Sequence, residues 1–420
     1  MPKGGRKKAN GHQRTSGRSR VENYSDEESV LNDNASVVSI ASSSIPDEGV
    51  EGEIDEQSQE EVFEEKLLEC VERLSEKSAQ VRTQALQAMA AALSKKYLPD
   101  FIFDRYVTLI EAIRSSLRRG RGPEQAAAAL LAPLLCVSLG PCEQSEEVAA
   151  TLSTVLHQVA GDNSASPQAR AKCCWALAVL SFLTEMEPAA AYASERLLID
   201  IFSGSYLKGD GHTPNIAPEV AALHAAALSG WTLLATVDGC QGLEMVGQDH
   251  LADMLGSGHL DVRVAAGEAL AVLHEIKPLE SPEQVCELLA ALATDSSHFR
   301  AKKERKAQRS SFREILAFIE EGRAPELKIR FGTEALELDT WASRKHYEAF
   351  CQVLGSGLNL HLAQNELLRQ VFALGAPLTA ADPTQKATKL ERHLVNAAAF
   401  KARTISRAKH RDKRSVAIAC

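Results

Sequence analysis

The chain has 420 residues, of which 45% are hydrophobic, 25% are charged and only 5% are aromatic. This balance is that of a soluble protein with enough apolar side chains to bury a core. Because Ala and Leu supply most of the apolar content, packed helices are favoured over sandwiches and barrels, which depend on β-branched and aromatic residues. No apolar run approaches the ~18 residues of a membrane span, and the basic N-terminus lacks the apolar stretch of a signal peptide. We therefore expect an intracellular protein with no membrane partner.

Charge is distributed in blocks, although the chain as a whole has a net charge of −9. Residues 1–20 carry seven Lys or Arg and no acid, whereas residues 21–65 carry fifteen Asp or Glu and no base. Residues 300–313 carry seven bases against one acid, and residues 386–414 carry ten bases against two acids. Since ionic screening limits a surface field to about 8 Å at physiological salt, each basic block can attract a polyanion despite the acidic total.

Residues 1–60 are predicted to be a disordered tail, which is basic at first and then acidic. The acidic part is rich in Ser and shows no period that could form a buried face. Ser25 precedes Asp26, Glu27 and Glu28, and is therefore a candidate phosphorylation site for an acidophilic kinase. A simple solvating acidic tail is the competing interpretation, and the sequence does not separate the two.

Residues 61–295 are predicted to form an armadillo- or HEAT-like α-solenoid. An Ala-Leu dipeptide inside an Ala-rich helix recurs five times, with Leu-to-Leu steps of 44, 47, 51 and 42 residues. Armadillo and HEAT units repeat at about 40–47 residues, and the longest step contains a Gly-, Pro- and Asn-rich loop over 203–218. Each unit would bury its apolar face by stacking on the next. The dipeptides are Ala85-Leu86, Ala129-Leu130, Ala176-Leu177, Ala227-Leu228 and Ala269-Leu270.

The first helix of this region is predicted over 62–74 and the second over 81–97. A short polar connection separates them, which predicts an antiparallel pair. The apolar residues of the first helix recur mostly at helical spacing and are Val62, Leu67, Leu68, Val71 and Leu74.

Residues 296–380 are predicted to form a further, mostly helical region. A basic stretch leads into an amphipathic helix, and residues 325–341 then indicate a short extended or irregular element with a turn at Gly332. Further helices are predicted over 341–355 and 362–375, with a C-terminal cap and turn at Gly355-Ser356-Gly357. The apolar face of the amphipathic helix is Phe312, Ile315, Leu316 and Ile319. Residues 381–420 are predicted to form a long basic helix and a polar tail.

No motif of an enzyme or a metal site is present at the spacing that its chemistry needs. The sequence has no phosphate-binding Gly-rich loop followed by Lys, no His-Glu-x-x-His and no Gly-x-Ser-x-Gly. The nine cysteines stand at irregular spacings, so we expect reduced thiols rather than a disulfide framework or a zinc finger. We therefore predict a protein that is not an enzyme, with no metal, no cofactor and no small-molecule substrate.

The basic residues of the last segment fall on one face if it is a continuous helix. Its Arg residues follow at steps of 11, 4, 4 and 3, and guanidinium presents rigid bidentate donors that suit phosphate. We predict that this stripe binds RNA, with a solvated helix tail or a nuclear import signal as the alternative interpretations. The stripe consists of Arg392, Arg403, Arg407, Arg411 and Arg414, with Lys401, Lys409 and Lys413 among them.

Two smaller basic clusters are further candidates for phosphate contacts. Structured RNA, which is recognised by shape and backbone, fits them better than a DNA sequence, since no DNA-binding motif and few interleaved aromatics are present. The second basic patch also resembles a nuclear import signal. It consists of Arg300, Lys302, Lys303, Arg305, Lys306 and Arg309, and the minor basic loop consists of Arg118, Arg119 and Arg121.

Several segments resemble the interferon-related developmental regulators, from about residue 60 to residue 414. The resemblance implies a helical armadillo-like fold with no known enzymatic activity. The segments that carry it are IRFGTEALELDTWASRKHYEAFCQVLGSGLNLHLAQNELLRQVFALG, LATDSSHFRAKKERKAQRSSFREIL and ERHLVNAAAFKARTISRAKHRDKR, and in the repeats VRTQALQAMAAAL, SYLKGDGHTPN and VRVAAGEALAVL.

The resemblance implies two functions. The first is a translational repressor that binds inactive ribosomes, through rRNA and ribosomal proteins, and blocks access of mRNA and tRNA. The second is a nuclear co-regulator that bridges transcription factors to histone deacetylase co-repressor complexes in differentiating cells. We favour the first, in the cytoplasm with the nucleus as a second compartment, because an Arg stripe on a rigid array suits an rRNA-lined site. A nuclear import adaptor ranks last, since only Trp175 and Trp231 lie in the repeats and a regular Asn and Trp ladder would be needed.

Overall fold

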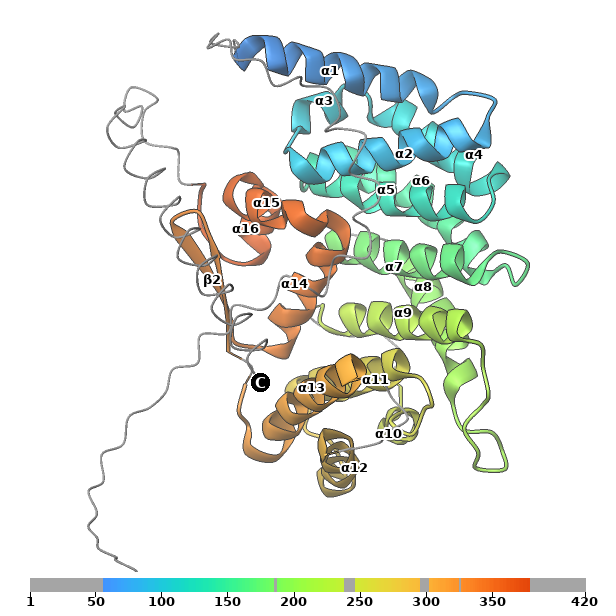
Figure 1. Ribbon diagram of the computed structural model, residues 1–420, viewed down its shortest axis with the longest axis vertical. Coiled ribbons are helices and arrows are strands. Elements are labelled where there is room, and N and C mark those ends of the chain that lie inside the picture. Colours follow the sequence, from blue (N-terminus) through green and yellow to red (C-terminus); the bar gives the residue numbers. More distant parts are fainter. Residues whose placement is uncertain (1–55, 185–186, 238–245, 295–301, 325, 378–420) are drawn as a thin grey trace, which may run out of the picture. The chain divides into compact units, whose positions relative to one another are not determined.

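The computed structural model describes residues 56–184, 187–237, 246–294, 302–324 and 326–377, and of residues 56–61 and 302–304 only the backbone. From Glu60 on, these residues belong to one compact unit. The unit is almost entirely helical (Figure 1). The tail predicted over residues 1–60 lies outside the described residues, except for the first residues of the first helix. The domain boundaries drawn after residues 295 and 380 stay predictions.

Alternating long helices of the unit stack side by side in one row, in which each helix packs on the next one of the row (Figure 1). The five Ala-Leu dipeptides all lie in this row, and every one of their residues except Leu130 is buried. Small residues let the helices approach closely: a Cβ built on Gly230 would stand 3.0 Å from the Ala178 Cβ. The predicted α-solenoid is confirmed. The row consists of α2 (Ala79–Lys95), α5 (Pro123–Leu139), α7 (Pro167–Leu183), α9 (Pro218–Ala235), α11 (Leu260–Ile276) and α13 (Lys302–Glu321).

A second layer covers the row, as expected for repeats built from helix pairs. Its helices pack on their neighbours in the first layer, and the loop predicted over 203–218 connects α8 to α9 through a short 3-10 turn, η4 (Ser203–Ser205). The second layer contains α4 (Tyr106–Arg119), α6 (Glu143–Gly161), α8 (Pro188–Phe202), α10 (Gln248–Met254) and α12 (Pro282–Thr294). Two further helices, α1 (Glu56–Arg73) and α3 (Pro99–Phe103), stand at the N-terminal end of the unit.

The apolar face predicted for the first helix is correct only in part. Leu67 and Leu74 are buried, whereas Val62 and Leu68 are 45% and 42% exposed. The reason is the position of α1 at the end of the stack, where neighbouring helices cover only one of its sides (Figure 1). The apolar face predicted for α13 is confirmed, since Phe312, Ile315 and Ile319 are buried and Leu316 is partly buried.

The extended element predicted before residue 341 is a β-hairpin. Strands β1 (Leu327–Phe331) and β2 (Glu334–Leu338) pair antiparallel, with Leu327 opposite Leu338. Gly332 stands in the turn at a φ of +55°, a left-handed conformation that favours glycine. Leu336 and Leu338 are buried, so β2 turns one face toward the core.

Four helical elements follow the hairpin, and they agree with the prediction only in part. The helix predicted over 341–355 is confirmed as α14 (Trp341–Leu354), which ends at Gly355 and is followed by η5 (Gly355–Gly357). The single helix predicted over 362–375 is wrong, because the chain breaks at Asn365 between α15 (Leu358–Gln364) and α16 (Glu366–Val371). The Asn365 Oδ1 accepts hydrogen bonds from the amides of Leu367 and Leu368, and so caps the second of these helices.

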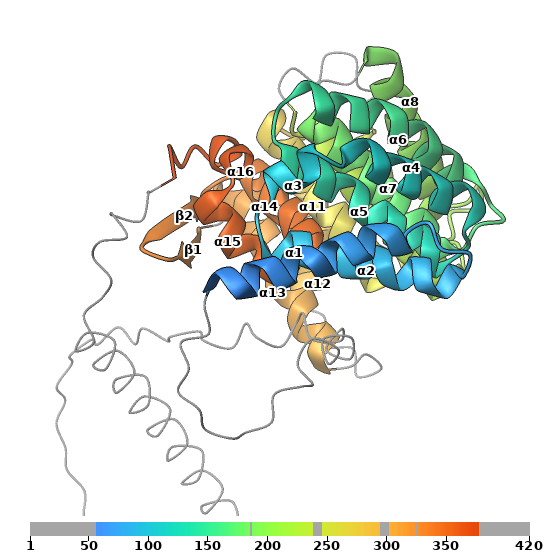
Figure 2. The ribbon, with the colours of Figure 1, turned by 90° about the horizontal axis from the view of Figure 1, so that it is seen from above.

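Residues 341–371, from α14 to α16, lie across the C-terminal ends of the stacked helices, and we call them the strap (Figure 2). The first residues of the strap contact α11. The Glu275 carboxylate of α11 accepts hydrogen bonds from the first amides of α14, at Trp341 and Ala342. A carboxylate at this position complements the positive end of the α14 dipole. Next, His346 contacts α7 and α9: its ring lies 4.6 Å from that of Phe182, and its Nε2 lies 2.8 Å from the Thr236 Oγ1.

The far end of the strap reaches the first helices of the row. His361 is buried and its Nε2 donates to the Leu93 carbonyl at 3.0 Å, and the Asn365 Nδ2 donates to the Val137 carbonyl at 2.7 Å. The last carbonyls of an α-helix have no partner within the helix, so these side chains satisfy acceptors that would otherwise be buried without one. The strap thereby ties together α2, α5, α7, α9 and α11 at the same end of each helix.

Candidate nucleic-acid interface

The structure describes only part of the predicted basic surface. The Arg stripe of residues 392–414, Arg300 and Ser25 lie outside the described residues. Lys302 and Lys303 occupy the first turn of α13, and only their backbone is described. Arg305, Lys306 and Arg309 lie further along the same helix, and the minor basic loop lies at the end of α4.

The contacts of α13 with its neighbours determine which of its side chains face solvent. A Cβ on Gly267 of α11 would stand 2.9 Å from the Phe312 ring, so the absence of a side chain there lets α13 pack closely. Gln308 is buried and holds both neighbouring helices, since its Oε1 accepts from Arg263 of α11 at 2.7 Å and its Nε2 donates to the Leu292 carbonyl of α12.

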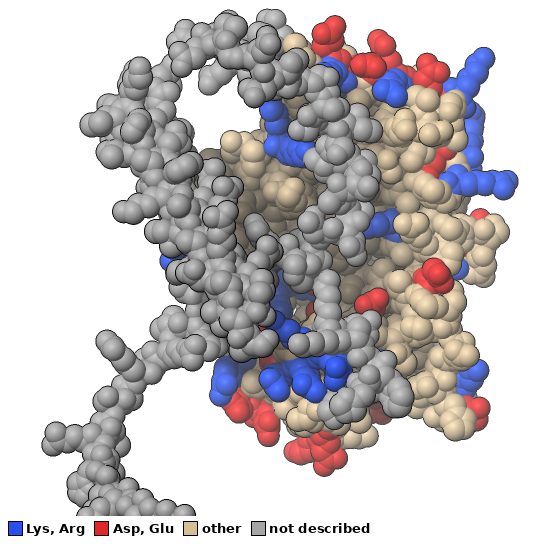
Figure 3. Space-filling view, in the orientation of Figure 1, with Lys and Arg blue, Asp and Glu red and all other residues tan. Residues whose placement is uncertain are grey.

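The opposite side of α13 is basic. Lys306, Arg309 and Arg313 follow at steps of 3 and 4, which places them on one helix face. Lys306 and Arg313 are exposed and Arg309 is partly exposed. Figure 3 shows Lys and Arg gathered over α13. The structure therefore adds Arg313 to the second basic patch.

The minor basic loop lies near the other end of the stack (Figure 3). Arg118 and Arg119 end α4, and Arg121 follows in the connection to α5. All three side chains are exposed. The two described basic surfaces are thus held at opposite ends of one rigid array.

Several buried charged groups belong to the strap and were not found from the sequence. The Lys345 Nζ lies 3.0 Å from Glu268 of α11 and 2.9 Å from Glu348. A second group surrounds Arg369, which donates to both carboxylate oxygens of Glu334 at 2.9 and 2.7 Å. Because Lys345 and Arg369 are 3% and 2% exposed and fully paired, they stabilise the strap and are not accessible to a ligand.

The remaining candidates for chemistry in the described part of the chain have structural partners. His224 is buried and its Nδ1 lies 2.7 Å from the Ser205 Oγ, and burial lowers the pKa of this imidazole. Within the described ranges, no group of three or more His, Cys, Asp and Glu side chains could hold a metal ion.

The cysteines described are free thiols. No described helix is long and apolar enough to cross a membrane.

These features define an α-solenoid whose helix ends are tied by its own C-terminal segment and whose exposed surface carries separate basic patches. Residues 34–320 match the family of the interferon-related developmental regulators, and residues 365–415 match the interferon-related protein conserved region. The chain belongs to this family.

Individual relatives cover most of the chain. It is 41% identical to interferon-related developmental regulator 2 of Mus musculus, over 86% of this chain and 85% of the relative. It is 39% identical to interferon-related developmental regulator 1 of Homo sapiens, over 86% of this chain and 83% of the relative. A more distant similarity, 27% over 43% of this chain and 47% of the relative, extends to an uncharacterized protein of Schizosaccharomyces pombe.

Proposed function

We propose that the protein is a non-enzymatic repressor of translation, which binds inactive ribosomes and occludes their mRNA and tRNA sites. The observation that carries the proposal is the position of the basic segment. Residues 386–414 carry ten bases against two acids, and they fall inside the match to the interferon-related protein conserved region over 365–415. A run of this charge binds a phosphate backbone through release of counterions.

The strap supports the proposal because it holds the chain that precedes the basic segment against the array. The last helix of the strap, α16, ends at Val371. Hydrogen bonds of Asn365 to the Val137 carbonyl and of Arg369 to Glu334 hold this helix against α5 and the β-hairpin. The basic segment starts at residue 386, 15 positions after Val371 in the sequence. A cationic segment attached to a rigid, curved body can enter an rRNA-lined channel while the body blocks its entrance, so repression requires binding and no chemical step.

The experiment is a ribosome pelleting assay with the purified full chain. Reversing three charges of the stripe, with Arg403→Glu, Arg407→Glu and Arg411→Glu, should reduce co-pelleting with ribosomes to background. The matched control reverses three exposed lysines elsewhere, Lys66, Lys208 and Lys277, and should retain most of the binding. Equal losses in both variants, or full binding by the stripe variant, would show that the stripe is not the binding site.

A further inference from the structure

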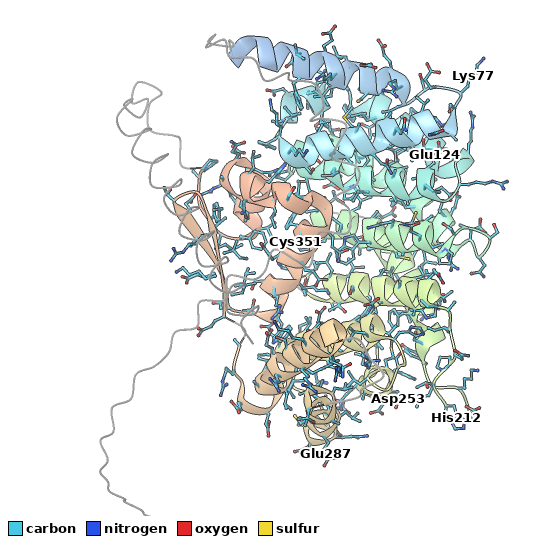
Figure 4. All side chains as sticks on the ribbon, in the orientation of Figure 1. Lys77, Glu124, His212, Asp253, Glu287 and Cys351 are labelled. Atoms are coloured by element: carbon cyan, nitrogen blue, oxygen red, sulfur yellow. The ribbon has the colours of Figure 1, made fainter. Side chains whose placement is uncertain are left out.

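A groove lies beside the minor basic loop, between the first turns of α2 and the connection from α4 to α5. It is open to solvent and has a volume of about 520 Å³. Gln80, Thr83 and Gln84 of α2 line one side, and Arg119 and Arg121 line the other. The labelled residues Lys77 and Glu124 mark this end of the stack in Figure 4.

Arg82 and Glu124, which both line the groove, form an ion pair with each other. Arg82 donates to both carboxylate oxygens of Glu124, from Nε at 2.7 Å and from Nη2 at 3.0 Å. Its Nη1 donates to the carbonyls of Glu76 and Lys77 at 2.8 and 2.9 Å. Glu124 is only 3% exposed, so the one carboxylate of the groove is neutralised and does not repel an anion at its mouth.

The backbone that carries the two arginines, at the end of α4 and in the connection to α5, is closely packed. A Cβ on Gly120 would stand 2.3 Å from the Ser116 carbonyl oxygen and 2.7 Å from the Glu124 Cδ, so the backbone here packs directly against both. The buried Gln125 side chain donates to the Leu117 carbonyl at 3.0 Å, which holds the end of α4 against the start of α5. The arginines therefore extend from a fixed backbone, which lowers the entropy lost when they bind a ligand.

Arg119 and Arg121, like the neighbouring Arg118, form no ion pair with a described residue, unlike Arg82 and Arg114 nearby. Arg82 is paired with Glu124, and Arg114 with Glu111. Arg119 and Arg121 are exposed and form no hydrogen bond or ion pair with another described residue. Two free guanidinium groups, in a groove also lined by amide and hydroxyl side chains, supply the hydrogen-bond donors that a phosphate group accepts.

We propose that this groove binds a backbone phosphate of structured RNA, at a site separate from the C-terminal stripe. The proposal rests on the proposed function and adds a second contact at the N-terminal end of the array. An RNA backbone is favoured over a single phosphorylated side chain because Lys77 and Arg118, both exposed, extend the positive surface beyond the groove. Two contacts on one chain raise the affinity for a large RNA surface more than either contact alone.

The test is a salt titration of the purified full chain with a 20-base-pair RNA duplex. The variant Arg119→Gln/Arg121→Gln should bind the duplex roughly tenfold more weakly at 0.1 M salt. The slope of log affinity against log salt should become shallower by about 1 for each lost phosphate contact. The matched control, Lys208→Gln/Lys277→Gln, removes two exposed charges that lie outside the groove and outside the positive surface around it, and should lose about threefold or less.

Three outcomes would overturn the proposal. They are an unchanged affinity of the groove variant, an equal loss in the control, and a loss of binding to a phosphoserine peptide without a loss of binding to the duplex. The groove variant is also combined with the stripe variant Arg403→Glu/Arg407→Glu/Arg411→Glu. The same fold-loss in that background shows that the groove acts independently, whether or not the stripe is the ribosome-binding site. Since neither arginine forms a hydrogen bond or ion pair with another described residue, circular dichroism should show unchanged folding.

Discussion

Lys345 of α14 lies 3.0 Å from Glu268 of α11, although the two residues are 77 positions apart in the sequence. The ammonium group also contacts Glu348 at 2.9 Å and is 3% exposed. Burial alone would lower the pKa of Lys345, but the two carboxylates raise it well above its usual range, so the side chain stays charged. This buried pair joins the strap to the stacked helices.

Removing the ammonium group should destabilise the protein strongly. Lys345→Met leaves Glu268 partly buried without its counter-ion, and the loss of one partner of a buried pair costs about 3–5 kcal/mol. Urea unfolding, followed by circular dichroism, measures the change. The double variant Lys345→Met/Glu268→Met removes both charges and should recover most of the stability. A double variant as unstable as the single one would show that the pair is not what holds α14 in place.

Gly357 is predicted to be essential for the contact of the strap with α2. A Cβ at this position would stand 1.6 Å from the Ser94 carbonyl oxygen, which belongs to helix backbone and cannot move aside. Gly357→Ala should therefore lower the free energy of unfolding by about 3 kcal/mol or more. Gly258→Ala is the control, since its Cβ would meet no atom within 4 Å, and its effect should stay within about 1 kcal/mol. Similar melting temperatures for the two variants would be inconsistent with this packing.

His346 makes the strap sensitive to acid. Burial lowers the pKa of this imidazole to about 4, whereas an unfolded chain has an ordinary His with a pKa of about 6.5. Below pH 6.5 the unfolded chain therefore binds a proton that the folded chain does not. The free energy of unfolding should fall by about 1.4 kcal/mol per pH unit from this group between pH 6.5 and 4.

A non-titrating side chain at the same position provides the comparison. Urea unfolding of His346→Gln between pH 7.5 and 5 should show a shallower loss of stability than that of the wild type. The remaining slope comes from other groups, such as His224 and His361, whose pKa values burial also lowers. Identical slopes in the two proteins would mean that His346 is not protected from protonation in the folded state.

The repeats could be predicted from the sequence because their signal is local. Each Ala-Leu dipeptide lies in one apolar helix, and its burial follows from the period of that helix alone. Helix α14 of the strap was predicted, but the position of the strap on the array was not, since that position is specified by contacts between distant residues: His361 and Leu93 are 268 positions apart, and Asn365 and Val137 are 228. In the sequence, Asn365 resembles an ordinary polar residue of a helix. The structure shows that it binds the Val137 carbonyl and caps α16.

The candidate site also combines features that the sequence indicates locally with features that depend on contacts between distant residues. Charge and helical spacing were enough to indicate the basic face of α13 and the minor basic loop. They did not indicate the groove, because its second side comes from Gln80, Thr83 and Gln84 of α2, about 40 residues earlier in the chain. Its neutralised carboxylate depends on the pairing of Arg82 with Glu124, which is visible only in the folded protein.

The most direct test of the central proposal is sucrose-gradient sedimentation of a cell lysate at low and high salt, with detection of this protein in each fraction. We predict migration with single ribosomes at low salt, which persists after nuclease trimming of mRNA and is lost as salt rises. A protein that stays in the light fractions at every salt concentration, and is recovered mainly from nuclei, would contradict ribosome binding and favour the transcriptional co-regulator.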